Sequence, residues 1–134
     1  MDSDLVTIGE IARRADVATS TVRYYERRGL MSPDAWQSGQ RRYRAGSLRR
    51  LVFIGMLQDA GLSLDDIDGI LNAASVNEWK TIARQRIDAL DQEIERLEHA
   101  RSYLQGALFC RFDHPLTDCA VMNAEIVRRL DQRP

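Results

Sequence analysis

The sequence has few of the features that mark a membrane or secreted protein. No window of 18 or more residues is continuously apolar, so we expect no membrane-spanning helix. The first ten residues, MDSDLVTIGE, are acidic and lack an apolar run, which argues against a signal peptide. Only two of the 134 residues are cysteines, too few for a disulfide scaffold. These absences predict a cytoplasmic protein whose thiols are free or bind a ligand.

Recognisable catalytic patterns are missing as well. The sequence contains no Ser-His-Asp set, no glycine-rich phosphate loop and no HExxH motif. The one arrangement that an enzyme would use is a thiol at Cys110 or Cys119 acting with His114. We therefore expect no enzymatic activity. A protein-interaction adaptor that uses only its long helix is the other alternative to a nucleic-acid-binding protein.

Positive charge is concentrated in the first half of the chain. The formal net charge is only −1, but residues 13–50 hold ten arginines and three acidic residues, a local net charge of +7. Residues 61–134 carry nine basic and thirteen acidic residues, a net charge of −4. A basic block on a nearly neutral chain is typical of a surface that binds a polyanion. A solvated charged surface would have the same composition, so charge alone does not establish the function.

Two short helices with clear end signals come first. Thr7 is an N-cap candidate with Glu10 three residues later, which predicts a helix over residues 8–15. A second helix is predicted over residues 19–28 and ends at Gly29, where a positive φ is easiest for glycine. Two helices joined by a short turn are typical of a helix-turn-helix motif.

The second of these helices is rich in hydrogen-bond donors. Its sequence provides Ser20 and Thr21 in the first turn and Arg23 one turn on, all suited to phosphates or base edges. Tyr24 and Tyr25 point about 100° apart on a helix, so one is expected to face DNA and the other to pack. We interpret this helix as one that enters the major groove.

Residues 30–43 are predicted to form a small β-hairpin or loop. Pro33, Ser38 and Gly39 mark turns, and the segment ends in Arg41, Arg42 and Tyr43, which offer a second contact with the DNA backbone. Two further helices follow, one over residues 45–60 and one capped by Ser63 that runs to about residue 72.

A long helix with an apolar seam occupies the second half. From Glu78 to Leu108 it would measure about 46 Å at about 1.5 Å per residue. Its seam alternates steps of four and three residues, with Arg101 as the one polar member: Ala83, Ile87, Leu90, Ile94, Leu97, Arg101, Leu104 and Leu108. The chain has no second helix of matching length for a helical hairpin, so the expected partner is the same helix of a second subunit.

These motifs resemble the MerR family of transcription regulators. The resemblance covers nearly the whole chain and is carried by these stretches: Thr7–Ala12 (TIGEIA), Thr21–Glu26 (TVRYYE), Gly29, Leu30, Pro33, Gly39, Arg41 and Tyr43, then the long helix. It implies an all-α fold with a small β wing, in which a winged helix-turn-helix head precedes a dimerisation helix that forms an antiparallel coiled coil. The implied domains are a DNA-binding head at 1–74, a coiled-coil helix at 75–108, and an effector loop with a C-terminal helix at 109–134.

The resemblance also implies a function and assigns residues to it. Members of this family bind promoters with an overlong spacer as homodimers, and an effector makes them untwist and bend the DNA so that RNA polymerase engages both promoter elements. By resemblance, the recognition helix would contribute Ser20, Thr21, Arg23 and Tyr24. The wing would contribute Arg41, Arg42 and Tyr43.

The C-terminal segment carries a possible metal site. Cys110, His114 and Cys119 form a C-x3-H-x4-C pattern beside a proline-containing turn. Two thiolates and an imidazole are ligands that suit Zn²⁺ or Cu⁺. The alternative is that the cysteines are structural and the effector is a redox signal or a small molecule bound against the long helix.

Two subgroups of the family resemble this segment. SoxR-type redox sensors hold an iron–sulfur cluster with four cysteines, but here Ala107 and Phe112 occupy two of those positions, so no such cluster is expected. The copper, zinc and mercury sensors use a cysteine pair in the same place. In the divalent-metal sensors the partner subunit adds a cysteine, at the position of Ser75 here, and Trp79 lies close by in the sequence. This resemblance implies that Ser75 of the second subunit contributes to the effector site. Trp79 is the second expected contributor, because a small organic effector would sit against the dimer helix near Trp79 and Tyr103.

Overall fold

The computed structural model describes residues 4–133, and these fall into two compact units that divide after Ile87. The first unit is the head, and the second begins at Asp88. The division lies inside helix α5 (Val76–Ala107), so the first turns of α5 belong to the head. The domain boundary expected after residue 74 instead coincides with the short connection that precedes α5.

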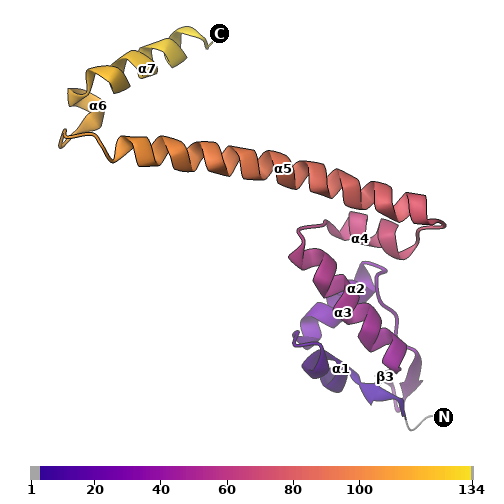
Figure 1. Cartoon of the computed structure of the whole chain (residues 1–134). Coiled ribbons are helices and arrows are strands. Elements are labelled where there is room, and N and C mark those ends of the chain that lie inside the picture. Colours follow the sequence, from indigo (N-terminus) through magenta and orange to yellow (C-terminus); the bar gives the residue numbers. More distant parts are fainter. Residues whose placement is uncertain (1–3, 134) are drawn as a thin grey trace. The chain divides into compact units, whose positions relative to one another are not determined.

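The head opens with the two predicted helices, α1 (Ile8–Arg14) and α2 (Thr19–Arg27), which Figure 1 shows in indigo and violet. Thr7 caps α1, because its side-chain oxygen accepts a hydrogen bond from the N–H of Glu10 at 3.1 Å. Gly29 follows α2 with φ of 75°, as its position after the helix predicts.

A three-stranded antiparallel sheet forms the wing. Its strand order is β1-β3-β2, from β1 (Val6–Thr7), β2 (Ala35–Gln37) and β3 (Gln40–Tyr43). Ser38 and Gly39 join β2 to β3 with φ of 52° and 74°, which is typical of a tight hairpin turn. The hairpin alternative for residues 30–43 is therefore correct. The pairing of β3 with β1 was not expected, since a two-residue strand has no sequence pattern of its own.

Helices α3 (Ala45–Asp59) and α4 (Leu64–Leu71) complete the head core. The buried side chains come from α1, α2, β3, α3, α4 and the connections between them: Ile11, Ala12, Val22, Tyr25, Leu30, Met31, Tyr43, Leu51, Ile54, Leu62 and Ile67. Of the apolar residues of α3, Leu51 and Ile54 are buried while Val52 and Met56 are exposed. The head core is thus built around α2 and α3, and Tyr25 joins the two through a hydrogen bond from its hydroxyl to Gln58.

Helix α5 has no buried residue in the single chain. Its seam is about half exposed, with Ile94 at 50% and Leu97 at 51% of their maximum accessible surface. Two short helices follow, α6 (Pro115–Asp118) and α7 (Ala120–Asp131). Within residues 4–133 no helix is both long and apolar enough to cross a membrane.

Candidate nucleic-acid interface and thiol pocket

Helix α2 has one buried face and one open face. Val22 and Tyr25 lie in the core, while Ser20 and Arg23 are exposed. The expectation that the adjacent tyrosines separate is confirmed, because Tyr25 is 5% exposed and Tyr24 is 40% exposed. The open face therefore presents the donors that the sequence placed there, with Thr21 half-buried at its edge.

Two arginines at the end of α2, the last helical residue Arg27 and the C-cap residue Arg28, gather around Tyr24 and were not singled out from the sequence. The guanidinium carbons of Arg27 and Arg28 lie 5.7 and 5.9 Å from the centre of the Tyr24 ring. Arg28 also donates a hydrogen bond to the Tyr24 hydroxyl at 3.0 Å. These contacts hold two positive charges beside the exposed ring, which favours an anionic partner on this face. Arginines spaced three and four residues from an aromatic side chain would have indicated this cluster.

The single acidic side chain of α2 faces the wing. The Glu26 carboxylate accepts a hydrogen bond from Arg41 Nε at 2.6 Å and another from the Tyr43 hydroxyl, and its side chain is only 11% exposed. Arg41 also lies over the ring of Trp36, 5.2 Å from its centre. Arg41 therefore joins α2 to the wing, in addition to any contact that it makes with DNA.

The prediction that Tyr43 contacts DNA requires a correction. Tyr43 was expected among the residues that contact DNA, but its side chain is fully buried in the head core and its hydroxyl is bound to Glu26. A tyrosine enclosed in this way has no surface to offer a DNA strand. Burial raises the pKa of Tyr43 above its usual range, and the hydrogen bond to the Glu26 carboxylate raises that pKa further. The role of Tyr43 is to anchor the wing.

Arg23 and Arg42 are brought together from different elements. They line one polar hollow of about 230 Å³ with Thr7, Gly39 and Gln40, between α2 and the wing. Arg42 is half-buried and donates a hydrogen bond to the Arg41 carbonyl at 2.9 Å, so its guanidinium is held near the wing backbone. Arg41 lines the same hollow, and a hollow lined by three arginines is suited to a phosphate or a guanine edge.

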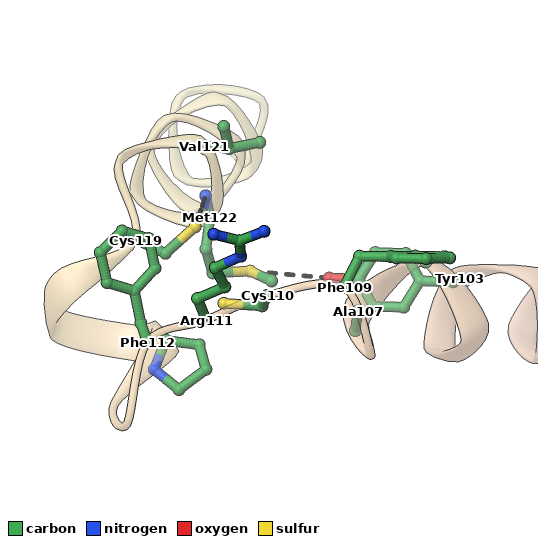
Figure 2. Close-up of a pocket in the computed structure, with 11 residues that line it drawn as sticks. Tyr103, Ala107, Phe109, Cys110, Arg111, Phe112, Cys119, Val121 and Met122 are labelled. Atoms are coloured by element: carbon green, nitrogen blue, oxygen red, sulfur yellow. Dashed lines mark hydrogen bonds between the residues drawn. The ribbon is translucent and has the colours of Figure 1, made fainter.

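The second unit contains a cavity of about 600 Å³ with both cysteines in its wall (Figure 2). Three aromatic side chains also line it, Tyr103 from α5 and Phe109 and Phe112 from the segment that follows. Cys119 is half-buried and caps α7, because its sulfur accepts a hydrogen bond from the N–H of Met122 at 3.4 Å. Cys110 is exposed.

The three expected metal ligands do not form a site in the single chain. His114 is the N-cap residue of α6 and does not line the cavity that Cys110 and Cys119 share. In the described part of the chain, residues 4–133, no group of three or more His, Cys, Asp or Glu side chains is placed to hold a metal ion. The three residues are close in sequence, but only the two cysteines line the cavity, and α6 lies between His114 and Cys119.

Ser75 and Trp79 lie at the start of α5, within the head. The Ser75 hydroxyl accepts a hydrogen bond from the N–H of Glu78 at 3.2 Å, so it caps α5. Trp79 is 41% exposed, with the Lys80 ammonium 5.7 Å from its ring centre. Their contribution to the effector site of a second subunit stays a prediction.

Comparison with known proteins assigns the head and the long helix to one group of regulators. The family described as "MerR HTH family regulatory protein" matches residues 6–74, and the family described as "MerR, DNA binding" matches residues 48–107. The SoxR homologue of Chromobacterium violaceum, an HTH-type transcriptional activator, is 33% identical over 116 residues, which cover 82% of this chain and 78% of that protein.

Two further relatives extend over most of the chain. The HTH-type transcriptional regulator ZntR of Escherichia coli is 29% identical over 126 residues, covering 87% of this chain and 89% of ZntR. Among solved structures, the transcription regulator PbrR691 of Ralstonia metallidurans in complex with lead(II) is similar, with a TM-score of 0.71 and 25% identity over 89% of this chain and 98% of that chain. These relatives are transcription regulators and not enzymes.

The Tyr43–Glu26 contact gives a testable dependence on pH. Tyr43→Phe should lower the free energy of unfolding by about 1.5–3 kcal/mol at pH 7, the usual value of a hydrogen bond to a charged group. Because the folded protein raises the pKa of Tyr43, its neutral hydroxyl contributes stability fully below the ordinary tyrosine pKa of about 10 and loses that contribution as the pH rises further. Urea unfolding at pH 7 and at pH 10–11.5 should show the difference between wild type and variant shrinking.

The matched control for this prediction is Tyr24→Phe, which removes the same hydroxyl from an exposed tyrosine on α2. We expect it to change stability by less than about 0.5 kcal/mol. Equal losses for the two variants, or a wild-type advantage over Tyr43→Phe that does not change with pH, would contradict the role given to Tyr43.

Proposed function

The chain belongs to the MerR family of helix-turn-helix DNA-binding transcription regulators, and from this we propose that it works as a homodimer on a promoter with two half-sites. Each head reads one half-site through α2 while its wing holds the backbone. A signal bound by the C-terminal unit changes the shape of the promoter spacer, so that RNA polymerase engages both promoter elements.

The observation that carries this proposal is the shared hollow of Arg23 and Arg42. Arg23 lies on the open face of α2, where a helix in the major groove meets base edges, and a bidentate arginine–guanine contact is the commonest specific one. Arg42 lies on the wing, which follows the helix in the chain and reaches the adjacent phosphates. Base reading and backbone binding thus come from two elements that the Glu26 contacts hold together.

Dimerisation is supported by the exposure of the apolar side chains along the α5 seam. Ile87, Ile94, Leu97 and Leu104 recur at heptad spacing, and each keeps half or more of its surface exposed in the single chain. A helix of this length with an apolar seam requires a partner helix to bury it. A second copy supplies an identical seam. The resulting two-fold dimer matches a promoter whose half-sites are inverted repeats.

The signal is proposed to bind in the thiol cavity. Cys110 and Cys119 share its wall, and a pair of thiolates suits Cu⁺. A closed zinc site needs four ligands, and the described residues of one chain do not bring even three together. The aromatic lining favours a second candidate, an apolar thiol-reactive molecule. In either case, a coupling of about 1–3 kcal/mol between signal and DNA conformation suffices for a switch.

Substitution of Arg23 tests the reading of DNA. An operator duplex is first selected from a random library with the wild-type dimer. Arg23→Ala should then weaken binding to that duplex by about 1–3 kcal/mol and relax the preference at one base pair of each half-site. Arg42→Ala should weaken binding to all duplexes and make the salt dependence less steep. Arg96→Ala removes the same charge from an exposed position of α5 and should leave binding unchanged; equal losses in all three variants would contradict the proposal.

Substitution in the seam tests the dimer. Leu97→Asp places two carboxylates in one apolar interface, where an unpaired charge is costly to bury. Sedimentation at micromolar concentration should show a dimeric wild type and a monomeric variant that no longer binds the operator. Gln92→Asp adds the same charge at an exposed position outside the seam and should remain dimeric. A monomeric wild type, or dissociation by both substitutions, would contradict the seam as the interface.

Replacement of the thiols tests the signal site. Cys110→Ser and Cys119→Ser should each abolish the response to the signal while operator affinity changes less than tenfold, or about 1.4 kcal/mol. The response is read from a fluorescent base in the promoter spacer after addition of Cu⁺, Zn²⁺ or N-phenylmaleimide, and metal content is measured by elemental analysis. If the double variant responds as the wild type does, the signal does not bind at these thiols.

A further inference from the structure

The first turns of α5 are fixed to the head at two glycines. Arg86 donates a hydrogen bond from Nε to the carbonyl of Ala60, the C-cap residue of α3, at 3.0 Å. Its guanidinium group lies directly over Gly61, where an added Cβ would stand 2.2 Å from Nη2 and 2.8 Å from Cζ. One turn earlier on the same face of α5, Ile82 packs on Gly69 of α4, where an added Cβ would stand 2.8 Å from Cδ1.

This contact depends on the particular residues at both ends. Gly61 has φ of 81°, which a side chain would strain, and it also leaves room for the guanidinium plane. Arg86 is half-buried and supplies a positive charge to the carboxyl end of α3, where the helix dipole favours a cation. A lysine offers a donor but no flat group to lie on the glycine. The two contacts stand four residues apart on α5, so together they resist both sliding and rotation of its first turns.

We propose that the Arg86 contact sets the spacing between half-sites that the dimer accepts. Helix α5 runs unbroken from Val76 to Ala107, so the segment held by Arg86 is continuous with the apolar seam. In a two-fold dimer, the separation and rotation of the two recognition helices depend on how each head is fixed to its own dimer helix. Half-site spacing follows from that geometry.

Loss of the Arg86 contact should therefore change the half-site spacing that the dimer accepts, while the fold of the head and its recognition of one half-site are kept. Without Arg86, the head keeps its core, its α2 face and its covalent link through residues 72–75. Ile82 would stay packed on Gly69, but the first turns of α5 would lose the contact that holds them at Ala60 and Gly61. Each head still recognises its half-site, but the dimer accommodates half-sites that are one base pair nearer or farther. This inference rests on the proposed function, since it requires a dimer that reads two half-sites.

The experiment measures operator affinity as a function of spacer length. The half-sites of the selected operator are kept, and the spacer is shortened or lengthened by one and two base pairs. We expect the wild type to lose at least about tenfold in affinity for each base pair, because each added pair displaces and rotates one half-site relative to the other. Arg86→Ala should bind its best spacer within about tenfold of the wild type, and its affinities across the series should differ by less than about threefold.

Three variants separate this role from general stability. Arg84→Ala removes the same charge two residues away, at an exposed position, and should keep the wild-type spacing profile. Arg86→Lys should give an intermediate profile. Gly61→Ala retains Arg86 but fills the space that its guanidinium group occupies. It should therefore show the same small differences in affinity across the spacer series as Arg86→Ala. If Gly61→Ala does not fold, Arg86→Lys remains as the second test. A merely structural role would lower the melting temperature of Arg86→Ala and leave its spacing profile unchanged.

The outcomes distinguish the inference from the proposed function. If the wild type discriminates between spacers and Arg86→Ala discriminates equally well, the inference is wrong and the proposed function stands. If the wild type selects no duplex with two half-sites, both are wrong.

Discussion

The DNA-binding surface of this protein depends on the carboxylate of Glu26. It binds Arg41 and Tyr43 of β3 at once and thereby joins the recognition helix to the wing. Charge-assisted hydrogen bonds of this kind are roughly twice as strong as neutral ones. Without the carboxylate, the buried Tyr43 hydroxyl would lose its acceptor, at a cost of about 1–3 kcal/mol. Because residues advance about 100° along a helix, the same stretch points Tyr25 into the core and Glu26 at the wing while Arg23 and Tyr24 stay outside.

Local signals in the sequence were sufficient to predict the main helices and the hairpin, but not β1 or α6. The Thr7 cap, Gly29 after α2, the turn at Ser38 and Gly39, and the heptad seam each act within a few residues or one helix, and the structure has the corresponding element at each place. The winged helix-turn-helix fold followed from their order together with the resemblance to known regulators.

The errors in the predicted site concern contacts between distant residues. Tyr43 lies seventeen residues from Glu26, and no periodicity relates a strand end to a helix. The sequence therefore showed a tyrosine beside two arginines but not that it is buried. The thiol segment differs from the prediction in the opposite way, because closeness in sequence suggested three ligands on one site and the single chain places only two of them on one cavity wall. Pro115 begins α6 directly after His114, and the turn leaves only Cys110 and Cys119 on the cavity wall.

A footprint on the selected operator tests most directly whether two copies of this head read DNA. Hydroxyl radicals cleave the sugar wherever protein does not cover it, so they map contacts on each strand. If α2 and the wing of both subunits bind together, we expect two protected blocks related by a two-fold axis. Their centres should lie a whole number of helical turns apart, each about 10–10.5 base pairs. A single protected block, or uniform protection along the duplex, would contradict the reading of two half-sites by a dimer.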